Sequence, residues 1–333
     1  MADYYRKSLA ELIETILTHL PKKSGDAARE FVTQFYHKMP LMELERLDPA
    51  HAATLAMNAF AFVQDRTPGQ LKSRIYKPTT KEHGWESDGY VLELLNDDMP
   101  FLVDSATAEL QRLKVAPLST MHPILKLSRN SKGSFDKMQP MTGQGALSES
   151  FIQFQLPRLP DGLTPEALLK EVQEVLTAVR RVVTDWPAMV AQCEKTEAAF
   201  AAGESHFKDD EVQETIAFLR WLRNKNFVFL GYIEYDFYDD AGNEVLSVVP
   251  GSELGLFKSN DQELKPQGLS ALPPEVRHFA MLPHMLEITK SNRKSVVHRP
   301  VHMDYIGLKR FNAHGKAIGE RRFLGLFTSI VYY

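Results

Sequence analysis

Residues 90–114 read YVLELLNDDMPFLVDSATAELQRLK, and they set the fold of the chain on either side of them. The first six residues are apolar or aromatic apart from one glutamate, which is typical of a short buried strand. The polar turn 96–100 ends that strand, and apolar residues then recur at three- and four-residue steps over 101–114, the spacing of a helix with one buried face. The stretch therefore predicts a strand, a tight turn and a helix.

Two more strands and a second helix follow. Residues 124–127 and 151–156 are strand-like apolar runs, separated by a serine- and glycine-rich connection. Thr164-Pro165-Glu166 opens a long amphipathic helix with a capping hydroxyl and a proline in its first turn. The order strand, helix, strand, strand, helix fits a ferredoxin-like α+β layer. The fourth strand of such a layer is missing from its usual place, and residues 73–77 are the upstream candidate to supply it.

The rest of the chain makes this a multidomain α+β protein. Residues 1–66 carry helical periodicity and predict a helical N-terminal cap. The ferredoxin-like domain is expected over 70–187, and an Ala- and Glu-rich helical linker over 188–209. Residues 210–333 predict a leading helix and an antiparallel sheet with two hairpins. The pattern stops inside its last strand, so this domain is expected to be truncated at its C-terminal end.

Composition excludes several classes of protein. Of the 333 residues, 44% are hydrophobic and 25% are charged, and the net charge is −4, so the chain is neither disordered throughout nor a general polyanion binder. Its single cysteine, Cys193, excludes an intrachain disulfide and a cysteine-built zinc site, and is interpreted as a packing residue. The sequence has no signal peptide and no apolar run of about 18 residues, which predicts a cytoplasmic protein without membrane contact.

The usual motifs of nucleotide and metal chemistry are incomplete. Gly143-Gln144-Gly145 lacks the third glycine of a dinucleotide fingerprint, and Gly315-Lys316 lacks the Ser or Thr of a P-loop. His298 and His302 have the spacing of a helical metal pair, but Pro300 between them argues against a helix. The sequence therefore predicts no catalytic residue, no bound cofactor and no metal in this chain.

Residues 289–322 are strongly basic, with a net charge of +7 in a chain of net −4. One interpretation is a surface for anions, phosphate or nucleic acid. The other is a sheet face or subunit contact in which arginines pair with acids, and the scarcity of interleaved aromatic residues favours it. Nucleic acid is therefore not the expected partner. The candidate interface or anion-pairing residues are Arg293, Arg299, Arg310, Arg321 and Arg322.

The turn 96–100 is a candidate ligand site. Backbone N–H groups at a helix start attract anionic groups such as an amino-acid carboxylate. Asp97 and Asp98 could accept hydrogen bonds from the ammonium of the same ligand. The alternative, favoured from the residues alone, is that one of these aspartates caps the helix.

Longer motifs run through the chain in a fixed order. They read NDDMPFLVDS at 96–105, HPI at 122–124, ESFIQ at 149–153, FLRWL at 218–222, NFVFLGY at 226–232, ITKSNR at 288–293, HRP at 298–300, DYIG at 304–307 and GERRFLGLFTS at 319–329. Together they resemble the N-terminal region of the large, NAD-specific glutamate dehydrogenases. The resemblance covers about residues 85–330, and the helical start is a weaker match.

The resemblance implies a parent enzyme that oxidatively deaminates L-glutamate to 2-oxoglutarate and ammonia with NAD. In that family this region precedes the catalytic domain, so the substrate lysines and Rossmann glycines lie beyond residue 333, and NAD belongs to the parent enzyme. The implied role is a non-catalytic region for regulation and assembly. Its implied partners are its own catalytic domain, further copies in a homo-oligomer and an amino-acid effector.

The resemblance also implies domain types. ACT-like modules are ferredoxin-like units that elsewhere bind amino acids as effectors, and the antiparallel domain is expected to be PAS-like. The ACT signature D-x-P-G-L-L is similar to residues 98–103, except that Phe101 replaces the glycine. A bulky ring where a ligand approaches the backbone argues against effector binding. The candidate effector-binding residues are Asn96, Asp97, Asp98, Met99, Pro100, Phe101 and Asp104.

Two functions of other classes stay open at this point. One is a stand-alone amino-acid sensor with no enzyme attached, which a reading frame that stops directly after Tyr333 would favour. The other is a nucleic-acid binder that uses residues 289–322, for which salt-dependent binding of generic DNA or RNA is the test.

Overall fold

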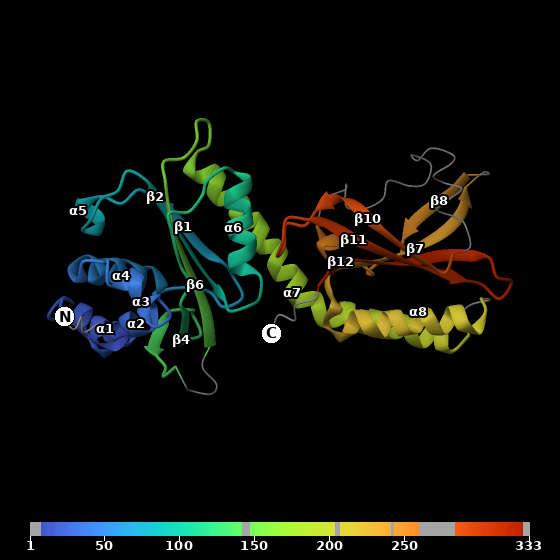
Figure 1. Cartoon of the computed structure of the whole chain (residues 1–333), viewed down its shortest axis with the longest axis horizontal. Coiled ribbons are helices and arrows are strands. Elements are labelled where there is room, and N and C mark those ends of the chain that lie inside the picture. Colours follow the sequence, from blue (N-terminus) through green and yellow to red (C-terminus); the bar gives the residue numbers. More distant parts are fainter. Residues whose placement is uncertain (1–7, 142–146, 204–206, 241–242, 260–283, 329–333) are drawn as a thin grey trace, which may run out of the picture. The chain divides into compact units, whose positions relative to one another are not determined.

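The chain forms two compact units, Met1–Leu176 and Thr177–Tyr333. The computed structural model describes residues 8–141, 147–203, 207–240, 243–259 and 284–328. Each unit has an antiparallel sheet with covering helices (Figure 1), and helix α7 (Pro165–Ala201) runs through the boundary between the units. The expected α+β class is therefore confirmed. Within the described residues, no helix is both long enough and apolar enough to cross a membrane.

The sheet of the first unit has the ferredoxin-like strand order. Its strands are β1 (Lys72–Tyr76), β2 (Tyr90–Asp97), β3 (Ser119–Met121), β4 (Ile124–Arg129), β5 (Phe135–Met138) and β6 (Leu147–Leu156). They lie in the order β1-β2-β6-β4-β5, and β3 pairs separately with β6. Strand β1 pairs antiparallel with β2, in the place of the missing fourth strand, as predicted for residues 73–77.

Two short strands of this sheet were not predicted. Strand β3 has 3 residues and β5 has 4, too few to show the two-residue alternation that identifies a strand in a sequence. Strand β5 lies inside the serine- and glycine-rich connection after β4, which was expected to have no strand.

Helices cover both faces of the first sheet (Figure 1). One face packs against α1 (Leu9–Leu17), α2 (Asp26–Tyr36), α3 (Leu41–Leu44) and α4 (Pro49–Val63), and the opposite face carries α6 (Leu102–Arg112) and the start of α7. The short helix α5 (Thr80–His83) follows β1. Helix α1 begins with a capping box in which Ser8 and Glu11 bond each other's backbone N–H, which explains why the helix starts there.

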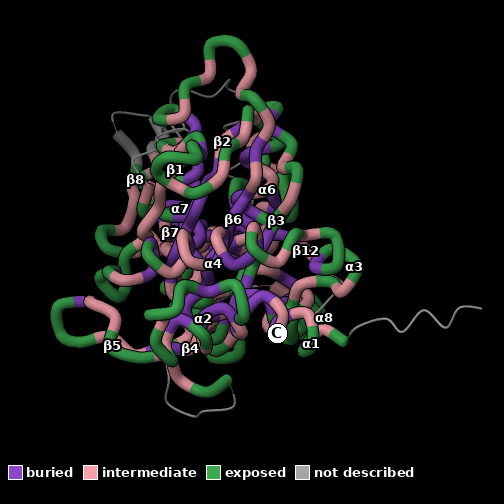
Figure 2. Tube along the Cα trace, turned by 90° about the vertical axis from the view of Figure 1, so that its left-hand side faces the viewer, coloured by how far each residue is buried: buried purple, intermediate pink, exposed green. Residues whose placement is uncertain are grey.

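The helical segment and the sheet share one hydrophobic core. Phe31 and Phe35 of α2 and Phe62 of α4 are buried with Leu95 of β2 and Phe151 of β6. The rings of Phe35 and Phe151 are 5.6 Å apart, within the range of favourable aromatic pairs. Buried residues accordingly run along α4 and the central strands (Figure 2).

The second unit has a mostly hairpin-connected sheet. Its helix α8 (Asp209–Trp221) continues into a π-helical turn (Leu222–Asn226), and a short 3-10 turn (Leu256–Lys258) follows β9. The strands are β7 (Phe227–Asp240), β8 (Asn243–Val248), β9 (Leu254–Gly255), β10 (Leu286–Lys294), β11 (His302–Phe311) and β12 (Ala317–Phe327). They lie in the order β10-β11-β12-β7-β8, with β9 beside β7. The two predicted hairpins, β7–β8 and β11–β12, are confirmed by their antiparallel registers.

Candidate functional site

The candidate effector turn joins β2 to α6 in the first unit. Asn96 is buried at the end of β2, whereas Asp98, Pro100 and Asp104 are exposed and Met99 is half-buried. The backbone N–H of Asp98 donates to the carbonyl of Ser148 at 2.9 Å, which fixes the turn to the start of β6. The predicted residues therefore run from the end of β2, through the turn 98–101, into the first turn of α6.

Helix α6 starts differently from the capping prediction. It begins at Leu102, its N-cap residue is Phe101, and no side chain caps it. The expected capping by Asp97 or Asp98 is therefore wrong. Phe101 has φ 72, a left-handed conformation that favours glycine. The ACT signature has glycine at this position, and the backbone of Phe101 keeps the conformation that this glycine can adopt without strain.

Asp97 is engaged in a buried charge network. The guanidinium of Arg66 contacts Asp97 at 2.5 Å and Glu149 at 2.9 Å. Arg129 donates to both carboxylate oxygens of Glu149 at 2.7 Å and to the carbonyl of Val63 at 3.0 Å. The side chains of Arg66, Arg129 and Glu149 are at most 1% exposed. The network joins the end of α4 to strands β2, β4 and β6. Asp97 therefore helps to hold α4 against the sheet.

The sequence analysis missed Arg66, Arg129 and Glu149. A signal was present for Glu149, which stands in an otherwise mostly apolar strand, where a carboxylate needs a cationic partner. No comparable signal marked the two arginines. Their distance from Glu149 along the chain, 83 and 20 residues, hides the contact until the sheet is formed.

Another buried carboxylate lies in the same sheet. Glu93 of β2 is 0% exposed and accepts from Arg74 at 2.6 Å and from Gln153 at 2.8 Å. The guanidinium of Arg74 also lies over the rings of Phe62 and Tyr76, 4.6 and 4.7 Å from their centroids. Burial and the nearby Glu93 raise the pKa of Tyr76 above its usual value. This cluster ties β1 and α4 to the centre of the sheet.

Negative charge dominates the surroundings of the turn. Loss of hydration lowers the pKa of His122, while Asp98 and Asp104 act in the opposite direction. A ring nitrogen of His122 lies 2.7 Å from the hydroxyl of Ser150. Asp98 and Asp104 are exposed near the start of α6, where their negative charge repels an incoming carboxylate.

The five candidate arginines do not form one patch. Arg310 lies on β11 and pairs with Asp236 and, at 3.9 Å, with Glu234 of β7. Arg322 on β12 contacts Glu320 at 2.9 Å. Arg299 is exposed and donates to the carbonyl of Phe327 at 2.8 Å. The predicted pairing with acids is thus found for Arg310 and Arg322. Of the remaining two, Arg293 is half-buried in β10, and Arg321 is half-buried in β12 opposite Glu234.

Glu320 is the centre of a buried polar cluster on the second sheet. Lys309 contacts its carboxylate at 2.5 Å, and the hydroxyl of Tyr305 also donates to it. Arg322 lies between the rings of Tyr235 and Tyr305, 4.7 and 4.5 Å from their centroids. Burial acts to raise the pKa of Glu320, but Arg322, Lys309 and Tyr305 overcome it and hold the pKa at about 2.

Cys193 lies in the interior of the second unit, and no metal site is found near it or elsewhere in the described residues. Cys193 is fully buried, its thiol lies 3.8 Å from the carbonyl of Leu219, and burial raises its pKa to about 12, as expected of a packing residue. Among the described residues, no group of three or more His, Cys, Asp or Glu side chains is arranged to hold a metal ion. The predicted fragment Gly143-Gln144-Gly145 lies outside the described residues.

Comparisons with known proteins agree with the resemblance seen in the sequence. Residues 31–172 match the family model described as glutamate dehydrogenase, ACT1 domain. The chain is 33% identical, over 329 residues and 97% of its length, to the NAD-specific glutamate dehydrogenase of Halomonas elongata. The protein of the same name from Pseudomonas aeruginosa is 30% identical over 342 residues and 100% of the chain. That of Mycobacterium tuberculosis is 28% identical over 148 residues, 43% of the chain.

The chain spans only part of these relatives. It covers 20% of the Halomonas protein, 21% of the Pseudomonas protein and 9% of the Mycobacterium protein. The ACT1 match falls on the first unit, which has the ferredoxin-like strand order and the turn with a left-handed Phe101. The chain is therefore homologous to the N-terminal portion of the large NAD-specific glutamate dehydrogenases and carries the ACT1 domain of that family.

Proposed function

We propose that this chain is the non-catalytic regulatory and assembly region of a large NAD-dependent glutamate dehydrogenase. The observation that carries the proposal is that 97% of the chain aligns with such an enzyme while covering only 20% of it. In this proposal a catalytic domain elsewhere in the polypeptide converts L-glutamate, NAD and water to 2-oxoglutarate, ammonia and NADH.

The described part of the chain has no parallel strands that could form a Rossmann-type dinucleotide site. A dinucleotide site of the Rossmann type needs parallel strands and a glycine-rich turn into a helix. Every strand pair within the described residues is antiparallel, and the turn from β2 into α6 holds Phe101 where a phosphate would need open backbone. We therefore assign the cofactor to the catalytic domain of the parent enzyme.

We assign the ACT-like unit a structural rather than a ligand-binding role. An amino-acid effector would need its carboxylate at the start of α6, beside the exposed Asp98 and Asp104. Its ammonium would need an acceptor, but Asp97 already contacts Arg66 at 2.5 Å. The helices α1–α4 also cover one whole face of the sheet and share its core. These features favour a domain that holds neighbouring parts of the chain in place over a domain that binds a ligand.

The second unit is proposed to be PAS-like. Its first and last long strands, β7 and β12, are neighbours in the centre of the sheet, and the hairpin strand β8 and strand β10 form the two edges. This order, with a leading helix before β7, supports the assignment. Like the first unit, it contains a buried ion pair, that of Lys309 with Glu320.

Assembly is proposed to involve the catalytic domain of the same polypeptide and further copies of the chain in the cytoplasm. Trp221 is 46% exposed and stacks on Phe218 at 6.0 Å between ring centroids, and both rings contact Phe327. Exposed aromatic clusters of this kind are typical of contact surfaces. The second unit therefore offers a surface that suits a protein partner.

A direct assay tests the proposal on the chain alone. Purified protein is assayed for glutamate-dependent formation of NADH, and NAD binding is measured by calorimetry. We expect neither turnover nor binding. Turnover clearly above background would overturn the non-catalytic assignment.

A second assay separates this role from a stand-alone amino-acid sensor. The unsubstituted 333-residue chain and its Phe101→Gly variant are screened with a panel of amino acids by thermal shift. We expect no stabilisation of either protein. A saturable shift for one amino acid, lost in Asp98→Ala, would instead support the sensor function.

A further inference from the structure

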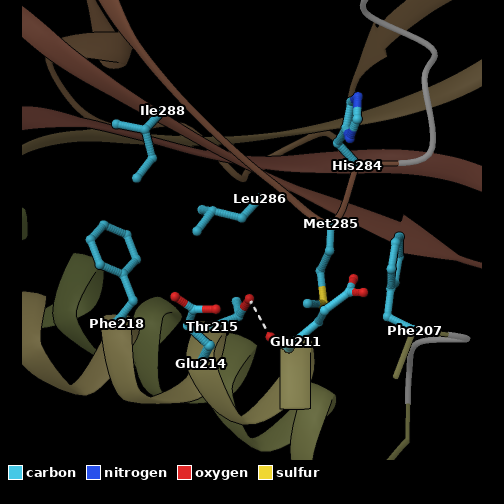
Figure 3. Close-up of a pocket in the computed structure, with 9 residues that line it drawn as sticks. All are labelled: Phe207, Glu211, Glu214, Thr215, Phe218, His284, Met285, Leu286 and Ile288. Carbon is cyan, nitrogen blue, oxygen red and sulfur yellow. Dashed lines mark hydrogen bonds between the residues drawn. The ribbon is translucent and has the colours of Figure 1, made fainter. Parts of the chain in front are cut away.

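A pocket of the second unit lies between helix α8 and the first residues of strand β10 (Figure 3). Its volume is about 410 Å³, within the usual range of small-molecule sites. It is lined by Phe207, Glu211, Glu214, Thr215, Phe218, His284, Met285, Leu286 and Ile288. Neither the turn at Phe101 nor the basic segment 289–322 contributes to it.

Two carboxylates extend from α8 toward the strand at this pocket. Glu211 and Glu214 are three residues apart, so their side chains lie on one face of the helix. Neither is ion-paired within the described part of the chain, although Glu194 and Glu197 on the neighbouring α7 both contact Arg223. The pocket therefore combines a concave surface with uncompensated negative charge.

Five of the remaining lining residues are apolar or aromatic, and Thr215 and His284 complete the lining. Phe218 and Phe207 stand at the two ends of the pocket, and the side chains of Met285, Leu286 and Ile288 face the helix from the strand side (Figure 3). Met285 is 5% exposed, whereas Ile288 is 46% exposed, so the wall runs from the core out to solvent. Each ring is held by another aromatic contact, Phe207 by Phe311 at 5.3 Å and Phe218 by Trp221 at 6.0 Å.

We propose that this pocket binds a small organic cation, a primary ammonium on an unbranched apolar chain. An ammonium has three donors, so it can donate hydrogen bonds to one of the two carboxylates while the charge of the other also attracts it. The apolar chain of the ligand then lies over Leu286 and Ile288, and the flanking rings add cation–π attraction.

The same arrangement selects against amino acids. The α-carboxylate of a zwitterion would lie beside Glu211 and Glu214, where like charges repel. The pocket thus prefers an amine to the amino acid from which decarboxylation would give it. The proposal does not depend on the regulatory and assembly role, although Phe218, at one end of the pocket, also belongs to the exposed aromatic cluster with Trp221.

Three matched probes test the proposal with the whole chain. Pentylamine carries the ammonium and the apolar chain, norleucine adds the carboxylate, and 1-pentanol removes the charge. Binding is measured by calorimetry and by saturation-transfer NMR at low ionic strength. We expect saturable binding of pentylamine that is at least about tenfold tighter than that of either other probe and that weakens as salt is added.

Variants locate the site. The double variant Glu211→Gln, Glu214→Gln keeps side-chain size and should weaken pentylamine binding about tenfold or more. Asp209→Asn removes one charge from the same helix outside the pocket and should leave the affinity within about twofold. The proposal is overturned if pentylamine binding does not saturate, or if 1-pentanol or norleucine binds as tightly as pentylamine. It is also overturned if Asp209→Asn weakens pentylamine binding as much as the double variant does. Circular dichroism of the double variant checks that it is folded. Should it unfold, Ile288→Lys, which removes an apolar contact and adds a positive charge at the exposed end of the pocket, must weaken pentylamine binding.

Discussion

Phe101 combines a left-handed backbone conformation, which favours glycine, with a half-buried aromatic side chain. Its φ of 72 places it in the left-handed region, where a side chain costs about 1–2 kcal/mol. Because Phe101 is also the N-cap of α6, the strain lies at the point where β2 passes into the helix. The sequence showed that glycine was replaced, but the strain became visible only from the backbone angle.

Replacing Phe101 therefore separates strain from packing. Phe101→Gly relieves the left-handed strain but loses the half-buried ring, whereas Phe101→Val loses the ring and adds the greater strain of a β-branched residue. We expect the glycine variant to be more stable than the valine variant by about 1–2 kcal/mol in urea unfolding. Equal stabilities of the two variants would contradict the strained backbone.

Glu320 gives the second unit a specific acid sensitivity. Its pKa in the folded chain is about 2, against 4.5 for an unperturbed glutamate, so its pairs stabilise the fold at and above pH 4.5. That stability is lost as the pH falls from 4.5 toward 2, because the unfolded chain binds the proton first.

The variant Glu320→Gln tests this dependence. It removes the titrating group, so the unfolding free energy should be lower than in the parent at pH 7 and should fall less steeply between pH 4.5 and 2. Chemical unfolding at a series of pH values gives the pH dependence of the unfolding free energy for both proteins. If the decrease between pH 4.5 and 2 is the same in the variant, Glu320 is not its source.

The contact between helix α4 and the first sheet depends on a few buried charges. Arg66 follows α4 directly, and Arg66 and Arg129 meet Glu149 in an environment at most 1% exposed. A buried pair of this kind specifies a geometry more than it adds stability, but removing one partner leaves uncompensated charge. The helical segment is thus fixed to the sheet by geometry as well as by its shared core.

Glu149→Ala should accordingly lower the unfolding free energy by about 3–5 kcal/mol, because two buried guanidinium groups lose their carboxylate. The exposed pair Lys170–Glu174, 3.8 Å apart and more than half exposed, is the matched control, and Glu174→Ala should change stability by less than about 1 kcal/mol. Both are measured by urea unfolding. Similar losses in the two variants would show that the network is not specific.

Long elements were predictable, and contacts between them were not. The helix over 101–114, the strand at 90–95 and the two hairpins follow from local periodicity and turn residues, and all are present. The upstream β1 was predictable because a ferredoxin-like layer without a fourth strand leaves an open edge. The start of α6 was not, because the position of its first residue depends on how the turn is held against β6.

The candidate sites show the same limit. The sequence suggested Asp97 as an acceptor for a ligand ammonium, but it could not show that Asp97 contacts Arg66. It grouped five arginines by net charge, whereas strand alternation and pairing separate Arg310 from Arg322. The pocket of Glu211 and Glu214 depends on the approach of α8 to β10, which no local pattern contains.

At the scale of the whole molecule, each unit contains buried charge pairs that hold its elements together. In the first, Arg66, Glu93 and Glu149 are buried and paired, and in the second Lys309 and Glu320 are. The chain as a whole is homologous to about a fifth of the large glutamate dehydrogenases.

The most direct measurement compares the complete enzyme that carries this region with a version lacking residues 1–333. Light scattering gives the mass of the assembly, and the glutamate-dependent formation of NADH is assayed on the same samples. We expect the shortened enzyme to keep NAD binding but to change its oligomeric mass and its kinetics. Unchanged mass and unchanged kinetics would contradict a regulatory and assembly role, and loss of NAD binding by a folded remainder would contradict the non-catalytic assignment.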